Sequence, residues 1–269
     1  MPQFDLMRNK AHFLRKEALK LHKLAGETRI ASTLSAIEIF VVLYYGRVLS
    51  FSEDFEWKDR DRLIISKGHG SFCIYPILAD IGYFDKSELQ KMGRANSILG
   101  AIPDSLIPGF ETTNGSLGHG LGVGCGIALA LKRKNCSQKV FVVAGDGELN
   151  EGSMWEAIMF ASYHKLDNLI LIIDNNKISM LGHQKDIIVN TPFTDRFKSF
   201  DWETNKVDGH DVENLFNALI AAKKNCGKPQ VVIAETVKGK GVAVLEDKPL
   251  CHVMSLNPSE IDATLEEWE

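Results

Sequence analysis

Two polar clusters in this sequence carry residues that could hold a metal ion beside a diphosphate. Asp146 lies between Gly145 and Gly147, and Asn176 follows the next apolar run along the chain. Mg²⁺ prefers oxygen ligands and usually takes only a few from protein, the rest coming from phosphates and water. The Asp146 carboxylate, the Asn176 amide and the main-chain carbonyl of Ile178 would supply the protein's share. The two glycines would let the backbone approach a diphosphate at a helix N-terminus.

The elements that must position these clusters are short apolar runs, each followed by a group of Gly, His, Asp or Asn residues. The runs are 63–65, 140–143, 169–173 and 231–234. Between them lie segments long enough for crossover helices, notably 118–132 and 151–163. This pattern predicts an α/β fold with a doubly wound parallel sheet and helices on both faces. Each cluster alone is typical of a turn, but such sheets bind ligands where their strands end, which favours a site.

The two ends of the chain have different patterns. Helical spacing of apolar residues predicts a helical N-terminal segment over 8–48, with Ser35 capping a second helix over 36–45. No linker or repeat divides the sequence, which favours a single domain over 1–269. The polar C-terminal residues, 239–269, are expected to form a mobile tail.

Composition excludes several classes of protein. With 269 residues, 45% hydrophobic and 25% charged, the chain is typical of a globular protein and not of a disordered or fibrous one. A net charge of −4 argues against a nucleic-acid binder. No apolar stretch approaches the roughly 20 residues that span a bilayer, and no secretory signal begins the chain. The 5 scattered cysteines are expected to be reduced thiols, so we expect a cytoplasmic protein with no membrane contact.

On its motifs the sequence resembles the N-terminal, diphosphate-binding half of the transketolase family of thiamine diphosphate enzymes. The match covers nearly the whole chain, with the motif blocks in family order. They are the blocks at 66–71, 108–109, 113–118, 145–152, 174–179, 207–211 and 236–242.

The resemblance implies a thiamine-diphosphate-binding fold, with thiamine diphosphate and Mg²⁺ (or Ca²⁺) as cofactors. By analogy, Asp146, Asn176 and the Ile178 carbonyl would hold the metal. It further implies roles at the cofactor or in catalysis for His69, Gly115, Leu117, Gly147, Glu151 and His252. Of these, Gly115 and Leu117 match positions that line the cofactor rings. His69, Gly147 and His252 match positions at the diphosphate or the reacting atoms, and Glu151 matches an acid at a dimer interface.

Histidines in less specific contexts have simpler interpretations. His69 alone would be typical of a turn, and only its motif favours a functional role. His210 and Asp211 could form an acid–base pair, but we interpret this block as structural. Asp208 and Asp211 are expected to cap the helix over 212–222.

Three positions depart from the family pattern. Arg29 and Ile102 stand where transketolases usually carry histidines, and His119 stands where glutamine is usual. Histidine is the natural proton carrier near neutral pH, and a positioned acid or base contributes roughly 10²–10⁴-fold. We therefore expect an unusual donor or acceptor, with Arg29 and His119 as possible substrate contacts. A guanidinium suits a carboxylate or phosphate, so the substrate is expected to be phosphorylated or acidic.

The resemblance also implies a partner. In the family the cofactor lies between the diphosphate-binding domain and a pyrimidine-binding domain, and the residues after Lys238 are too few to form the latter. We expect a separate pyrimidine-domain subunit, as in split transketolases, in an α2β2 heterotetramer of carbohydrate metabolism.

The predicted function is transfer of a two-carbon ketol or acyl unit from a ketose or 2-oxo donor to an aldehyde. One alternative is the α subunit of a decarboxylating 2-oxo acid dehydrogenase or acetoin-type enzyme. Another is a noncatalytic cofactor-binding partner. A dinucleotide-binding protein is less well supported, because no G-x-G-x-x-G opens the first strand–helix unit.

Overall fold

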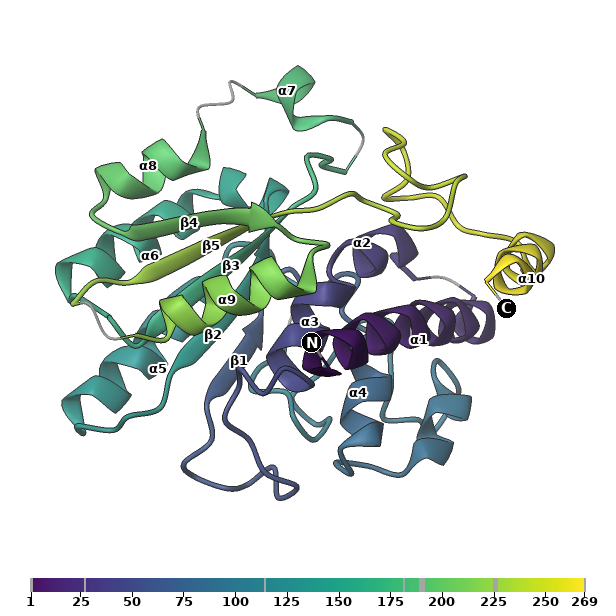
Figure 1. The fold of residues 1–269 in the computed structure, drawn as a ribbon, viewed down its shortest axis with the longest axis horizontal. Helices are drawn as coiled ribbons and strands as arrows, with labels where there is room; N and C mark the ends of the chain where they lie inside the picture. The colour runs from purple at the N-terminus through teal and green to yellow at the C-terminus, as the bar shows by residue number, and fades with distance from the viewer. Residues whose placement is uncertain are drawn as a thin grey trace.

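The computed structural model describes residues 2–26, 28–113, 115–180, 182–188, 192–224 and 227–268. In this part of the chain the strands form one parallel sheet in the order β1-β2-β3-β5-β4 (Figure 1). The strands are β1 (Arg62–Ile65), β2 (Val140–Gly145), β3 (Leu169–Asn175), β4 (Glu203–Asp208) and β5 (Gln230–Glu235). All but β4 coincide with the predicted apolar runs. The edge strand β4 was missed because its sequence is polar and most of its side chains are exposed.

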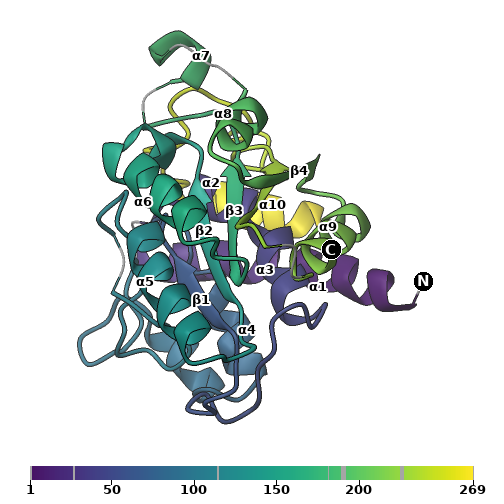
Figure 2. The same cartoon turned by 90° about the vertical axis from the view of Figure 1, so that its left-hand side faces the viewer.

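Helices cover both faces of the sheet, which confirms the doubly wound α/β prediction. Figure 2 shows α5 and α6 on one side of the strands and α1 and α9 on the other. Successive residues of a strand point to opposite faces: Phe141 and Val143 pack with the α1 side, while Val140 and Val142 pack with the α5 side. The main helices are α1 (Pro2–Ala25), α3 (Ile37–Tyr44), α5 (Gly120–Arg133), α6 (Gly152–Tyr163), α8 (Phe193–Ser199) and α9 (Val212–Ala222).

Shorter helices complete the fold. They are α2 (Ile30–Ser35), α4 (Ile74–Asp80), η1 (Lys86–Lys91), η2 (Gly147–Asn150), α7 (Gln184–Ile187) and the C-terminal α10 (Pro258–Glu267). Within the described ranges, no helix has the length and apolar character needed to cross a membrane.

The predicted cap at Ser35 is wrong. Ser35 is the last residue of α2, and α3 begins at Ile37 with Ala36 in the capping position. The Ser35 hydroxyl instead donates to the Asp174 carboxylate at 2.6 Å. That carboxylate is fully buried at the end of β3. Leaving it without hydrogen-bond donors would cost more free energy than leaving the helix without a side-chain cap.

The prediction of a mobile C-terminal tail is also wrong for the described residues. Val242, Leu245 and Cys251 are fully buried in the main core, and the Gly239 amide donates to the Ala31 carbonyl at 2.9 Å. Few but well-placed apolar residues therefore anchor a segment whose composition is mostly polar. Farther along, an Asn257 capping box starts α10.

His210 has the structural role that its motif suggested. Its Nδ1 lies 3.0 Å from Glu38 on α3, and its Nε2 accepts from the Val237 amide at 2.9 Å. Asp211 caps α9 as expected. Asp208 does not cap this helix, because its carboxylate accepts from the His210 amide.

Candidate functional site

A cavity of about 450 Å³ opens where the carboxyl ends of β1, β2 and β3 meet α2 and the C-terminal segment. Eight of the predicted residues line it: Arg29, His69, Leu117, Asp146, Gly147, Asn176, Ile178 and His252. The sheet order explains this convergence, because β1, β2 and β3 are neighbours and end at the same edge.

The three oxygens expected to bind metal come from two neighbouring strand ends, Asp146 after β2 and Asn176 and Ile178 after β3. The Asp146 carboxylate accepts from the Lys177 amide at 2.5 Å and from the Gly147 amide at 2.8 Å. The Asn176 side-chain oxygen accepts from the Ile178 amide at 3.2 Å. These bonds hold Asp146 and Asn176 at adjacent strand ends with little freedom to move.

A buried ion pair at the end of β3 lies next to the predicted metal ligands. The Lys67 ammonium donates to the Asp174 carboxylate and to the Ser32 carbonyl. Burial alone would raise the pKa of Asp174, but Lys67 and the hydroxyls of Ser35 and Thr236 hold that pKa below its ordinary value. Asp174 is therefore an ionised anchor for the residues around it.

A second lysine lies next to the predicted metal ligands. Lys238 is buried, and its ammonium donates to the Ile178 carbonyl at 2.8 Å. Burial lowers the pKa of Lys238 to about 8. Burial, together with the charge of Asp174, raises the pKa of Asp146 to about 7. Without a metal, the Asp146 carboxyl lacks enough positive charge around it to keep its ordinary acidity.

These residues fit a diphosphate with a divalent cation. Gly147 leaves little room for a side chain, since an added Cβ would lie 3.2 Å from the Ser179 hydroxyl. That hydroxyl is buried and has no partner in the described chain. No group of three or more His, Cys, Asp or Glu there could hold a metal by itself. A metal would thus depend on amide, carbonyl and phosphate oxygens, with Lys67 and Lys238 offsetting the phosphate charge.

Two imidazoles also line this cavity. The rings of His69 and His252 are 6.3 Å apart, and His252 Nδ1 lies 3.2 Å from the Ser32 hydroxyl. Burial, Lys238 and Arg29 lower the pKa of His252 to about 3. Burial and the nearby cations also lower the pKa of His69. Both rings are therefore neutral near pH 7 and can accept or donate hydrogen bonds.

Three predicted residues are not among those that line this cavity in the described chain. Glu151 is exposed at the start of α6, and His119 is exposed at the start of α5 with its Nδ1 beside the Leu117 carbonyl. Gly115 lies next to Ile102, whose methyl would be 3.5 Å from an added Cβ. None of the three is brought into contact with the predicted metal ligands.

Sequence reasoning missed several lining residues, among them Ser32, Lys67, Glu148 and Lys238. Glu148 is buried and accepts from the Ser66 hydroxyl at 2.5 Å and the Gly118 amide at 2.8 Å. Each of the two lysines follows a buried strand inside a recognised block, which is the only signal that could have indicated it. Apart from that position, nothing local distinguished it from an ordinary surface lysine.

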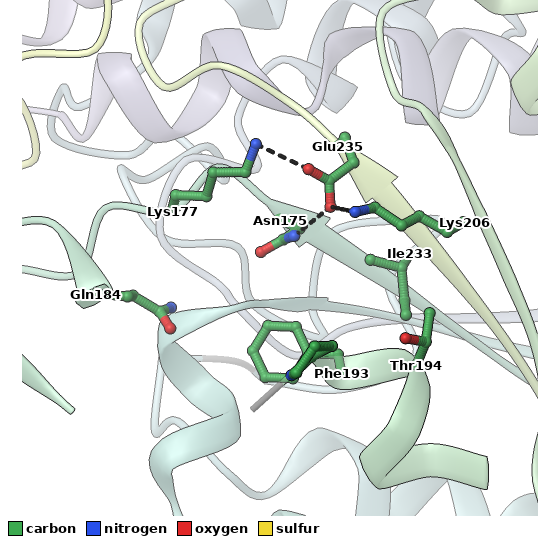
Figure 3. Close-up of a pocket in the computed structure, with 9 residues that line it drawn as sticks. Asn175, Lys177, Gln184, Phe193, Thr194, Lys206, Ile233 and Glu235 are labelled. Carbon is green, nitrogen blue, oxygen red and sulfur yellow. Dashed lines mark hydrogen bonds and ion pairs between the residues drawn. The ribbon is translucent and has the colours of Figure 1, made fainter. Parts of the chain in front are cut away.

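A second, smaller cavity of about 240 Å³ lies beyond the ends of β3, β4 and β5. Figure 3 shows Lys177 and Lys206 on either side of Glu235, which also accepts from Asn175. Its lysines are already paired with this carboxylate, and none of the predicted site residues lies there.

Fold and site together define an α/β chain built to bind a diphosphate cofactor. The family model described as transketolase, thiamine diphosphate binding domain matches residues 10–269. The chain therefore belongs to the transketolase family, which confirms the resemblance drawn from the motifs.

Similar proteins include chains of comparable length. One of the subunits of the apulose-4-phosphate transketolase of Actinobacillus succinogenes is 37% identical over 98% of this chain and 96% of its own. One of the subunits of the 6-deoxy-6-sulfo-D-fructose transketolase of a Clostridium species is 34% identical over 99% and 97%. The crystal structure of Campylobacter jejuni transketolase has a TM-score of 0.90 and 31% identity. The matched region includes 98% of this chain and 43% of the Campylobacter jejuni chain. This chain is thus a transketolase-like subunit.

Proposed function

We propose that this chain is the diphosphate-binding subunit of an enzyme that transfers a two-carbon unit from a ketose or 2-oxo donor to an aldehyde. The observation that supports it best is the cavity where Asp146, Asn176 and Ile178 oxygens lie beside two buried lysines. Bound thiamine diphosphate would supply the carbanion chemistry for breaking and forming C–C bonds. The described residues would act as a single domain that anchors and orients it.

The proposed roles of the residues follow from their positions. Asp146, Asn176 and the Ile178 carbonyl would hold Mg²⁺ or Ca²⁺, with Lys67 and Lys238 near the diphosphate. His69 and His252 would exchange hydrogen bonds and protons with the substrate. Gly115, Leu117 and Gly147 would contact the cofactor, and Glu151 would couple the site to a neighbouring subunit.

A second chain is proposed to complete the active site. Three apolar residues at the cavity, Met180, Ile187 and Val253, are 61%, 56% and 44% exposed. Clustered exposed apolar side chains are typical of surfaces that another chain covers. We propose a separate pyrimidine-domain subunit in an α2β2 assembly. Co-expression with candidate partner chains, followed by titration with thiamine diphosphate and Mg²⁺, tests this; full activity of the isolated chain would contradict it.

The substrate is proposed to be non-standard, within carbohydrate metabolism. Arg29 and Ile102 replace two histidines expected from the family, and the similar proteins are named for apulose 4-phosphate and a sulfonated sugar. The test is turnover of xylulose 5-phosphate with ribose 5-phosphate by the assembled enzyme. We expect slow turnover, and ordinary transketolase rates would refute the proposal.

A further inference from the structure

Arg29 differs from the other cations of the cavity in having no protein partner among the described residues. Lys67 is bonded to Asp174 and Ser32, and Lys238 to the Ile178 carbonyl. The Arg29 side chain is exposed, lines the cavity and makes no hydrogen bond or ion pair with another described residue. A guanidinium that the protein itself leaves unpaired is available to a ligand.

The position of Arg29 restricts which part of a ligand it can meet. It lines the cavity together with His69 and His252 and lies near enough to influence both rings. Under the proposed function, the diphosphate occupies the Asp146 end and the reacting carbons approach the imidazoles. An anion bound by Arg29 would then lie close to the reacting carbonyl and not several carbons away.

We propose that Arg29 is a specificity-determining residue that binds the carboxylate of a 2-oxo acid, the carboxylate being bonded directly to the reacting carbonyl carbon. The planar fork of the guanidinium matches the two carboxylate oxygens. This inference rests on the proposed function and narrows its substrate class.

The 2-oxo acid can enter the reaction in two ways. As donor it loses its carboxylate: hydroxypyruvate, an aldehyde RCHO and one proton give HOCH₂–CO–CH(OH)R and CO₂. The electron pair of the broken C–C bond forms the new one, and the proton goes to the aldehyde oxygen. As acceptor it keeps its carboxylate: a ketose and glyoxylate give an aldehyde and HOCH₂–CO–CH(OH)–COO⁻. The chemistry that Arg29 recognises is the same in both.

Two pairs of substrates, each with one carboxylate and one neutral member, test whether Arg29 recognises the carboxylate. Hydroxypyruvate and erythrulose deliver the same two-carbon unit, but only the former is a carboxylate. Glyoxylate and glycolaldehyde differ in the same way as acceptors. The assembled enzyme carrying Arg29→Met would be compared with wild type on each pair. Arg29→Lys tests the fork, and Arg133→Met, an exposed arginine at the end of α5, is the matched control.

In either the donor pair or the acceptor pair, we expect Arg29→Met to lower kcat/KM for the carboxylate substrate by about 10- to 100-fold. The kcat/KM for the neutral substrate of the same pair should change little. In the donor pair the change should be mainly in KM, because the charge leaves as CO₂ in the transition state. For the carboxylate substrate, the kcat/KM of Arg29→Lys should lie between those of Arg29→Met and wild type. Equal losses with charged and neutral members, or no wild-type preference for either carboxylate, would overturn this inference alone. No product from any donor would overturn the proposed function as well.

Discussion

Two groups of residues at this site are held in different ways. The first, called here the diphosphate end, comprises Lys67, Asp174, Asp146 and Lys238, which are at most 6% exposed and each bonded to another part of the chain. The second, called here the substrate end, includes Arg29, which is exposed and unpaired among the described residues, and His252, whose ring has one hydroxyl neighbour. The first group is organised by contacts within this chain, whereas Arg29 in the second has no such contact among the described residues. Of the three departures from the family pattern, Arg29 belongs to this second group.

The largest effect should come from breaking the buried pair at the diphosphate end. Lys67→Met leaves the Asp174 carboxylate buried without its counter-ion, so we expect the free energy of unfolding to fall by about 3–5 kcal/mol. Urea denaturation of the chain measures this. The double variant Lys67→Met/Asp174→Asn should recover most of the loss. A loss below about 1 kcal/mol, as for exposed pairs, would remove the contrast between the two ends.

A smaller but more specific effect is expected at the predicted metal ligand. Asp146→Asn keeps the shape but removes the charge, so thiamine diphosphate with Mg²⁺ should bind at least about 100-fold more weakly. Isothermal titration calorimetry of the assembled enzyme measures this. Asp195→Asn removes the same charge from the exposed start of α8 and should leave affinity unchanged. Unchanged affinity in the Asp146 variant would place the metal elsewhere.

The pH dependence of Mg²⁺ binding tests whether the Asp146 carboxylate is a metal ligand. Burial and Asp174 raise the pKa of Asp146 to about 7, and the charge of Lys238 partly opposes this rise. A metal needs the ionised carboxylate, so below pH 7 binding must first release a proton. Affinity for Mg²⁺ should therefore rise about tenfold from pH 6 to pH 8 and level off above. The Mg²⁺ affinity of free thiamine diphosphate over the same range is the control, and a matching profile would contradict the assignment.

The smallest effect is expected from reversing the departures from the family pattern. Ile102→His would restore one of the two missing histidines, next to Gly115. Turnover of xylulose 5-phosphate should rise by up to about tenfold, below the full range of a positioned acid or base, because Arg29 is unchanged. Adding Arg29→His should raise it further. If neither variant gained activity, these departures would not explain a non-standard substrate.

Local sequence patterns were sufficient for most of the framework. The continuous apolar runs predicted four strands, because strands buried on both faces require apolar residues at every position. The rule that parallel strands end at one edge then predicted that Asp146, Asn176 and His69 share a site, and the structure brings them to one cavity. Their spacing along the chain determined this without any knowledge of side-chain contacts.

Only the tertiary structure decided how charges and segments distant in sequence combine. No local pattern pairs Lys67 with Asp174, directs Ser35 away from its expected cap, or places Lys238 on the Ile178 carbonyl. The polar strand β4 and the C-terminal segment that carries His252 to Ser32 were likewise misjudged from composition. In each case the deciding free energy comes from burial and hydrogen bonding between distant parts of the chain. Sequence periodicity reports on which face of an element is buried, and not on which residue it meets there.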